Sequence, residues 1–267
     1  MKLLLNLYKP KDRMLSFASF GSPANPPVLF LHGFLGCKED FLPISKSLQD
    51  EFYCICVDLP GHGSPMSEDI LNPFLELQNA LYLEKTILVG YSMGGRLAMM
   101  LREEYSEKFP AAIIMSAHVG LKETTEKESR KNFESTWEHS LERDTLETFL
   151  DKWYNQPLFA SLKEKREVFK EVLLRRKKHD PVALLQMFRK MHLSKQTRYS
   201  LFKDTLFLFG DKDHKYRDLY KELPRDAQIE NIPNSGHCVH LENPSACAEK
   251  LFNFMVKTHN FSYDTNV

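Results

Sequence analysis

Short apolar runs, each bounded by turn residues, recur along the chain and alternate with stretches of helical period. Runs of about five residues are typical of strands that are buried on both faces, as in a parallel sheet. Helical stretches such as 95–105 and 245–257 separate or follow them. This alternation predicts an α/β fold with a doubly wound, mostly parallel sheet. The runs cover residues 28–32, 53–58, 86–90, 112–116 and 205–209, with a weaker one at 228–232.

The alternation is interrupted once. Between the runs at 112–116 and 205–209 the sequence contains only charged, amphipathic patterns of helical period. Helices placed between two strands of one sheet predict a helical cap that is inserted into the core. We therefore expect a core formed by residues 1–117 and 204–267, with the cap at 118–203.

Composition and charge narrow the class of protein. Of 267 residues, 42% are hydrophobic and 27% are charged, which is ordinary for a soluble globular protein. Lys and Arg number 36, as do Asp and Glu, so the chain lacks the basic excess typical of nucleic-acid binding. No apolar run approaches the roughly 20 residues that span a bilayer, and residues 1–7 form too short an apolar stretch for a secretory signal. Five scattered cysteines indicate reduced thiols, so we expect a cytoplasmic protein.

The positive and negative charges are unevenly distributed along the chain. Residues 121–200 hold 18 Lys and Arg against 13 Asp and Glu, and the rest of the chain carries the opposite excess. One interpretation is a solvated helical surface. The other is a positive lid over a site for an anionic small molecule. The sequence alone leaves both open.

The strongest chemical signal is the G-x-S-x-G pattern of residues 90–94, which centres on Ser92. It follows an apolar run and precedes a helical stretch, which is the setting of a strand-to-helix elbow. Such an elbow lifts a serine oxygen onto the carboxyl-terminal edge of the sheet. Glycines are needed on both sides because larger residues would clash in so strained a turn. Ser92 is therefore predicted to lie at a nucleophile elbow.

Two further residues complete the chain order Ser…Asp…His that this elbow requires. Asp213 follows the strand that ends at Gly210, and His237 follows the last predicted strand. A serine hydroxyl needs an imidazole to take its proton, and a carboxylate holds that imidazole in the right tautomer. Asp211 is better suited to forming the turn than to acting as this carboxylate. We therefore predict a triad of Ser92, Asp213 and His237.

The segment from His32 to Gly36, directly after the first buried strand, has the position of an oxyanion loop. The backbone N–H groups of Phe34 and Met93 are predicted to point at a developing negative oxygen. His32 and His62 are predicted to be structural. The chain has no ligand set at zinc spacing, no G-x-G-x-x-G after a strand and no G-x-x-x-x-G-K. We therefore expect no metal and no nucleotide cofactor.

These motifs together resemble two nested protein families. Nearly the whole chain resembles the α/β-hydrolase superfamily, through residues 32–36, 58–63, 90–95, 210–213 and 236–237. More narrowly, it resembles the MenH family, the synthases of 2-succinyl-6-hydroxy-2,4-cyclohexadiene-1-carboxylate in menaquinone biosynthesis, through residues 90–96, 118–121 and 153–162. The last segment is the most specific, because it lies in the predicted cap, where unrelated hydrolases share little.

The resemblance implies a carbon–oxygen lyase that uses no cofactor. Such an enzyme eliminates pyruvate from a cyclohexene intermediate that bears several carboxylates, and its serine–histidine pair abstracts a proton instead of forming an acyl-enzyme. Arginines on and beneath a basic cap suit a polycarboxylate substrate. The residues implied to bind the substrate are Arg96, Arg130, Arg175, Tyr91 and Trp153, with Arg176 as an equal alternative to Arg175.

The chain departs from the family pattern at two places. Val119 stands where the family commonly has proline, and residues 195–198 are unlike the usual cap sequence. A serine carboxylesterase on the same scaffold, including one that acts on a carrier-bound methyl ester, is therefore the alternative function. A ligand receptor without turnover is a third. Analogy of fold does not separate these functions, because function resides in the site.

Overall fold

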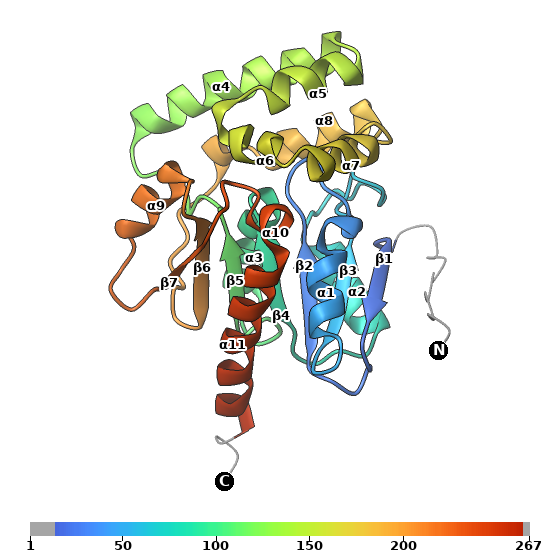
Figure 1. Cartoon of the computed structure of the whole chain (residues 1–267), viewed down its shortest axis with the longest axis vertical. Helices are drawn as coiled ribbons and strands as arrows, with labels where there is room; N and C mark the ends of the chain where they lie inside the picture. The colour runs from blue at the N-terminus through green and yellow to red at the C-terminus, as the bar shows by residue number, and fades with distance from the viewer. Residues whose placement is uncertain (1–13, 264–267) are drawn as a thin grey trace.

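A single sheet organises the computed structural model of the chain, which describes residues 14–263 (Figure 1). Within those residues its seven strands have the order β1-β3-β2-β4-β5-β6-β7. All neighbours pair in parallel except β1, which is antiparallel to β3. The predicted α/β fold is therefore confirmed, whereas the expectation for residues 1–7 falls outside the described residues. The strands are β1 (Phe17–Phe20), β2 (Pro27–Leu31), β3 (Tyr53–Val57), β4 (Ile87–Tyr91), β5 (Ala112–Met115), β6 (Thr205–Gly210) and β7 (Gln228–Ile232).

The central strands are apolar at every position because helices cover both faces of the sheet. Successive side chains of a strand point to opposite faces, so each position of a doubly covered strand is buried. In β2, Val28 and Phe30 pack in one core, and Leu29 and Leu31 pack in the other. The first core includes α1 (Leu42–Leu48) and α11 (Pro244–Tyr263), and the second includes α2 (Asn72–Ala80), α3 (Met93–Glu104) and α9 (His214–Lys221).

All six predicted strands are present, and the strand that the sequence missed lies at an edge of the sheet. β1 has four residues, of which only Phe17 and Ala18 are buried. At the other edge, four of the five residues of β7 are exposed, which explains its weak hydrophobic pattern. An edge strand has a neighbour on one side only, so fewer of its side chains need to be apolar.

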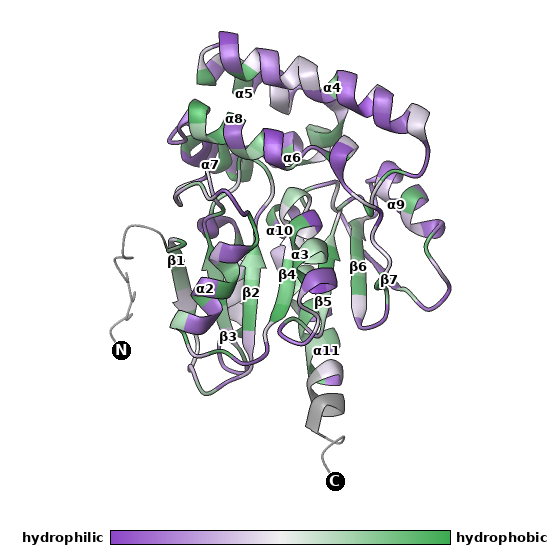
Figure 2. Cartoon of the chain, turned by 180° about the vertical axis from the view of Figure 1, so that it is seen from behind, coloured by the Kyte–Doolittle hydropathy of each residue, from purple (hydrophilic) through white to green (hydrophobic). Residues whose placement is uncertain are grey.

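Between β5 and β6 the chain forms helices, and residues 116–204 contain no strand. These helices lie over the carboxyl ends of the strands (Figure 1), and we refer to them together as the cap. Figure 2 shows that α4, the outermost of them, is mainly hydrophilic, whereas the sheet is mainly hydrophobic. The helical insertion is thus observed, and its predicted bounds as a domain, 118–203, stay a prediction. The cap comprises α4 (Thr124–Arg143), α5 (Leu146–Tyr154), η2 (Pro157–Phe159), α6 (Ala160–Glu164), α7 (Arg166–Arg176), α8 (Pro181–Lys190) and η3 (Leu193–Lys195).

A buried ion pair joins the cap to the core. Asp40, in η1 (Lys38–Phe41), accepts hydrogen bonds from Nη1 and Nη2 of Arg176 in α7, at 3.0 and 2.6 Å. Nearby, Nε2 of His179 lies 2.8 Å from the carbonyl oxygen of Leu35. These contacts hold the cap against the loop that follows β2. In the part of the chain that the structure describes, no helix is long and apolar enough to cross a membrane.

Candidate active site

Ser92 occupies the tight turn between β4 and α3. Its backbone angles, φ 51° and ψ −109°, are ones that a residue with a side chain adopts only under strain. A Cβ atom on Gly90 would lie 2.5 Å from the Gly94 oxygen, and one on Gly94 would lie 2.2 Å from the Leu31 oxygen. Both glycines of the G-x-S-x-G pattern are therefore required by close packing. The turn holds Ser92 at the carboxyl end of β4, beneath the cap.

Asp213 and His237 reach the same edge of the sheet from two separate loops. Asp213 follows β6, and its Oδ2 lies 3.0 Å from Nδ1 of His237. Both side chains are buried. A carboxylate can only accept at this distance, so Nδ1 carries the proton and Nε2 is left as a hydrogen-bond acceptor. Asp211 instead accepts hydrogen bonds from the backbone N–H groups of Asn234 and Ser235, so it forms the turn, as the sequence indicates.

Glu242 supports the loop that carries His237. Its buried carboxylate accepts hydrogen bonds from Gly236 N at 2.8 Å and from Cys238 N at 3.0 Å, on either side of the histidine. Ser161, in α6 of the cap, donates to the same carboxylate at 2.5 Å. No sequence motif singles out Glu242, because its role depends on three contacts that only the folded chain brings together.

The two predicted oxyanion-hole residues, Phe34 and Met93, both line the cavity that contains Ser92. Among the described residues, no hydrogen bond occupies the backbone N–H group of either one. The loop is fixed at the next residue, since Leu35 adopts a φ of 65° and donates its N–H to Nε2 of His62 at 3.0 Å. His62 is therefore structural, as predicted. The geometry leaves both N–H groups available to a ligand oxygen.

A cavity of about 120 Å³ between the sheet and the cap contains most of the predicted site residues. Asp213 does not line it, because it contacts the Nδ1 side of His237. Among the described residues, no hydrogen bond joins Ser92 to His237 in this structure. The structure thus brings the predicted residues together, while their catalytic roles stay a prediction. The lining includes Ser92, His237, Phe34, Met93, Arg96, Arg130, Tyr91 and Trp153.

Besides Arg176, which is discussed below, three cationic side chains line the cavity together. Arg96 comes from α3, Arg130 from α4 and Lys215 from α9. Burial and the positive charge of Arg130 lower the pKa of Arg96 to about 10, and the same two causes lower the pKa of Lys215. His118 nearby is held neutral, since burial and Lys215 lower its pKa to about 4. A bound anion would relieve this mutual repulsion.

Arg176 lines the cavity and Arg175 does not, which corrects the assignment of Arg175 to the site. The Arg176 guanidinium is already engaged, because Nη1 and Nη2 donate to Asp40 and Nε donates to Tyr154 Oη at 3.3 Å. Burial alone would raise the pKa of Asp40, but the ion pair with Arg176 holds it well below its ordinary value. Arg176 therefore joins cap to core and has little capacity left for a ligand.

The two predicted aromatic residues form walls of the cavity. The Tyr91 hydroxyl lies 3.1 Å from Sγ of Cys238, and its ring centroid lies 5.3 Å from that of His237. Trp153 packs edge-on against Phe34, with ring centroids 5.1 Å apart. Tyr91 thus packs against the catalytic candidate His237, and Trp153 joins the cap to the predicted oxyanion loop.

Comparison with known proteins agrees with this geometry. A sequence model described as the alpha/beta hydrolase family matches residues 28–250. The 2-succinyl-6-hydroxy-2,4-cyclohexadiene-1-carboxylate synthase of Citrobacter koseri is 31% identical over 245 residues, which cover 88% of this chain and 95% of that protein. Protein PHYLLO of Arabidopsis thaliana, a chloroplastic protein, is 30% identical over 273 residues, but these span 90% of this chain and only 16% of that protein.

The chain belongs to the 2-succinyl-6-hydroxy-2,4-cyclohexadiene-1-carboxylate synthase family of α/β hydrolases. The fold is also that of MenH from S. aureus, with a TM-score of 0.82 over 91% of this chain and 98% of that one. At 23% identity, that structural likeness supports the fold alone. The resemblance that the motifs indicated is thus confirmed.

The positions at which this chain departs from the synthase family lie together in space. Val119 and residues 195–197 line a second cavity of about 220 Å³. Arg96 lines this cavity as well as the one that contains Ser92. The departures therefore lie behind Arg96 and away from the triad, whose arrangement they leave intact.

Lys215 is a cation of the cavity that no sequence motif marks. It follows Asp213 by two residues, and a lysine at a helix start carries no distinguishing pattern. Lys215 is partly exposed to solvent, yet it lines the cavity, and its Nζ lies 5.6 Å from the centroid of the Tyr216 ring. Nearness to a predicted triad residue was the one signal in the sequence that could have indicated it.

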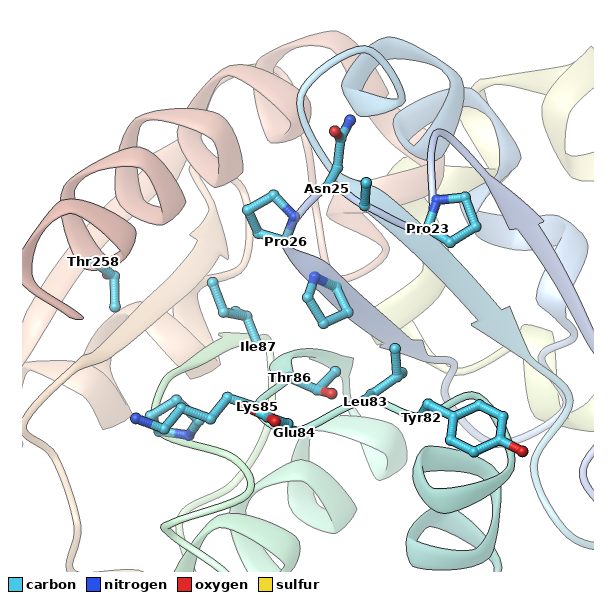
Figure 3. A pocket seen from close by; sticks show the side chains of 13 residues that line it. Pro23, Asn25, Pro26, Tyr82, Leu83, Glu84, Lys85, Thr86, Ile87 and Thr258 are labelled. Carbon is cyan, nitrogen blue, oxygen red and sulfur yellow. The ribbon is translucent and has the colours of Figure 1, made fainter. Parts of the chain in front are cut away.

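A larger cavity lies at the other end of the sheet and has none of the chemistry expected of the synthase family. It measures about 470 Å³ and lies between the loop before β2 and the segment that leads from α2 into β4 (Figure 3). None of the predicted site residues lines it. No group of three or more His, Cys, Asp or Glu residues that could hold a metal ion occurs in the described part of the chain.

Proposed function

We propose that the protein is a carbon–oxygen lyase. It eliminates pyruvate from a polycarboxylated cyclohexene intermediate and yields 2-succinyl-6-hydroxy-2,4-cyclohexadiene-1-carboxylate, a step of menaquinone biosynthesis. The observation that carries the proposal is the joint lining of one cavity by Ser92, His237 and three cations besides Arg176, which is paired with Asp40. A neutral substrate needs no such cluster, whereas several carboxylates need cationic partners when they leave water.

The triad supplies the base in this mechanism. Asp213 fixes the tautomer of His237, so Nε2 of His237 can take the hydroxyl proton of Ser92. At the same time the Ser92 oxygen removes a proton from a ring carbon of the substrate. The electron pair of the broken C–H bond passes into the ring and forms a carbon–carbon double bond. As this double bond forms, the C–O bond to the three-carbon group breaks with its electron pair on oxygen, so the group leaves as the enolate of pyruvate. The enolate then takes up a proton at its terminal carbon, equivalent to the one removed from the ring, and becomes pyruvate. No covalent bond to Ser92 forms.

The backbone and the cations stabilise the charge that develops on the substrate. As the proton leaves, negative charge spreads onto an adjacent carbonyl or carboxylate oxygen, and the N–H groups of Phe34 and Met93 can donate to it. Arg96 and Arg130 bind substrate carboxylates and keep the ring carbon near Ser92. Lys215 adds a third positive charge at the cavity. These roles require neither a metal ion nor a nucleotide.

The cap and the location of the protein fit the same proposal. Residues 118–203 act as a cap that carries Arg130 and Trp153 over the triad and keeps water away from the reacting carbon. A highly charged substrate does not cross membranes unaided, so a cytoplasmic enzyme suits it, and the five cysteines are buried, free thiols.

A serine carboxylesterase is the second candidate, because a strained Ser92 beside two free N–H groups also suits acyl transfer. The test is to give the purified protein the authentic cyclohexene intermediate and p-nitrophenyl esters in separate assays, each with a chelator and without nucleotide. Pyruvate release with slow ester cleavage supports the lyase. Fast ester cleavage without pyruvate release contradicts it and favours the esterase.

A further inference from the structure

We infer that Glu134 is a positioning residue that holds Arg130 in the orientation in which Arg130 binds a substrate carboxylate. The inference rests on the proposed function, since it assigns Arg130 a ligand. Glu134 lies in α4, one helical turn after Arg130, and its side chain is only 1% exposed. It does not line the cavity, so it acts through Arg130 and not on the substrate itself.

The Glu134 carboxylate is the meeting point of two cap segments. Oε1 accepts hydrogen bonds from Nε of Arg130 at 2.8 Å and from Leu193 N at 2.7 Å. Oε2 accepts from Oγ of Ser194 at 2.6 Å and from Ser194 N at 3.4 Å. Burial alone would raise the pKa of Glu134, but the bonds from Ser194 and Arg130 hold it below its ordinary value. Glu134 is therefore a buried anion that joins α4 to η3.

The ion pair with Glu134 leaves the edge of the Arg130 guanidinium that carries Nη1 and Nη2 without a partner among the described residues. Glu134 takes the Nε–H group, and within the described residues neither Nη group of Arg130 has a hydrogen-bond or ion-pair partner. A guanidinium is planar, so holding Nε fixes the direction in which the two Nη groups point. Phe133 limits rotation further, since its ring lies 4.9 Å from the Arg130 Cζ atom. The open edge is the one that binds a carboxylate with two parallel hydrogen bonds.

The same carboxylate also fixes the surroundings of Arg96. Nη1 of Arg96 donates to the carbonyl oxygen of Met191 at 2.5 Å. Met191 lies two residues before Leu193, which Glu134 holds through its backbone N–H. Glu134 thus orients Arg130 directly and steadies the acceptor that orients Arg96. A glutamate with a purely structural role would support the cap without affecting how these two arginines bind a ligand.

The test is a double-mutant cycle that combines Glu134→Gln with Arg130→Ala. Binding of benzene-1,2,4-tricarboxylate, a stable polycarboxylate, is followed by tryptophan fluorescence. Both tryptophans of the chain lie in the cap, and Trp153 lines the cavity. Steady-state kinetics are measured on the same preparations with the cyclohexene intermediate and with p-nitrophenyl acetate. Thermal unfolding reports whether each variant remains folded.

Glu134→Gln is expected to weaken tricarboxylate binding, and to raise KM for the intermediate, by about tenfold to a hundredfold. Hydrolysis of the neutral ester should change little. In the Arg130→Ala background the same substitution should weaken binding far less, because the direct route through Arg130 is gone and only the indirect effect on Arg96 remains. The matched control is Glu142→Gln, two turns further along α4, where the carboxylate pairs with Arg189 outside the cavity. It should leave binding and both activities unchanged.

Losses that add in the double variant, or equal losses on the ester and the intermediate, would overturn the inference, as would unaltered binding in Glu134→Gln. If Glu134→Gln does not fold, Glu134→Asp keeps the charge with a shorter side chain and should weaken binding in the same direction. If the Glu134→Asp variant binds the tricarboxylate as tightly as the wild type does, the inference is also overturned. Tricarboxylate binding needs no turnover, so a lack of pyruvate release would count against the proposed function alone.

Discussion

Ser92 and His237 act as a single unit in the proposed mechanism, because the Ser92 oxygen removes the substrate proton only when His237 accepts the hydroxyl proton of Ser92. Replacing either with alanine should lower kcat for pyruvate release by about three to six powers of ten, and the double replacement should cost little more. Asp213→Asn should lower kcat somewhat less, and Asp211→Asn much less. Rates of pyruvate release from the four single variants and the double variant test this order. Nearly full activity in Ser92→Ala would leave His237 as the sole base.

The residues that the sequence could identify are those whose roles depend on local geometry. Ser92 was found because its turn needs glycines at fixed offsets, and His237 because it follows a strand end in the right order. Glu134 could not be found, since its partner Ser194 lies 60 residues away in the chain. Lys215 could not be identified from the sequence either, because its position near Arg96 and Arg130 depends on how α9 packs beneath the cap.

Among the elements, α2 ends in a way that its sequence does not favour. The N–H of Leu83 donates to Gln78 O at 2.9 Å and that of Tyr82 donates to Asn79 O at 3.1 Å, which is the Schellman pattern. That pattern places Tyr82 in the left-handed region, with φ 55°, where glycine is usual. The Tyr82 side chain is 93% exposed, so little packing offsets the strain.

Tyr82→Gly should therefore stabilise the protein. The left-handed conformation costs an ordinary residue about 1–2 kcal/mol, and part of this gain is offset by the greater freedom of glycine in the unfolded chain. We expect the free energy of unfolding to rise by roughly 0.5–1 kcal/mol in urea titrations. Tyr82→Ala, which removes the ring and keeps the strain, is the control. Equal stability of the two variants would contradict the role of the backbone angle.

Strands could be predicted from sequence more completely than the cap helices. A strand covered on both faces must be apolar throughout, so β2 through β6 are distinct as short runs. The cap helices are charged and covered on one side only, and their bounds depend on contacts with each other. The middle of α4 and the start of η3, for example, meet at Glu134, through contacts that no local pattern marks.

At the scale of the whole molecule, the basic cap fits both interpretations of its charge. Its outer surface carries exposed pairs such as Lys177 with Glu147, which are worth little. Its inner surface presents Arg130 to the cavity. The cavity of about 120 Å³ is smaller than the roughly 300–1,000 Å³ of ordinary ligand pockets. Asp40 and Arg176, which both line this cavity, hold the cap against the core.

The stability of the whole molecule should depend on pH through its buried histidines. Burial lowers the pKa of His32 to about 4 and that of His240 to about 3. Histidines in the unfolded chain have a pKa near 6.5, so below that pH the unfolded state binds more protons than the folded state. Stability should therefore be greatest above about pH 6.5 and fall as the pH is lowered toward 4.

His240→Phe tests this origin of the pH dependence. The His240 ring packs against Phe41 and Tyr91, with centroids 4.9 and 4.2 Å apart, and neither ring nitrogen has a hydrogen-bond partner among the described residues. Phenylalanine removes both nitrogens and the proton uptake. Urea midpoints at pH 8, 6 and 5 should show a smaller acid loss in the variant than in the wild type. Parallel losses in both proteins would assign the pH dependence to other groups.

The proposed lyase activity depends on whether the cations of the cavity bind the carboxylates of the substrate. Arg96 is the sharpest place to ask, because its backbone N–H donates to Ser92 O at 3.1 Å, one helical turn from the triad. The measurement is kcat/KM for pyruvate release and for hydrolysis of a small neutral ester, in wild type, Arg96→Ala and Arg96→Lys.

Arg96→Ala should raise the barrier to pyruvate release by roughly 2–5 kcal/mol, the usual cost of removing one partner of a desolvated charge pair. Ester hydrolysis by the same variant should change little, and Arg96→Lys should recover only part of the loss, since an ammonium group cannot form the bidentate fork. Equal losses on both substrates would mean that Arg96 serves the fold instead of the substrate, and would contradict the account.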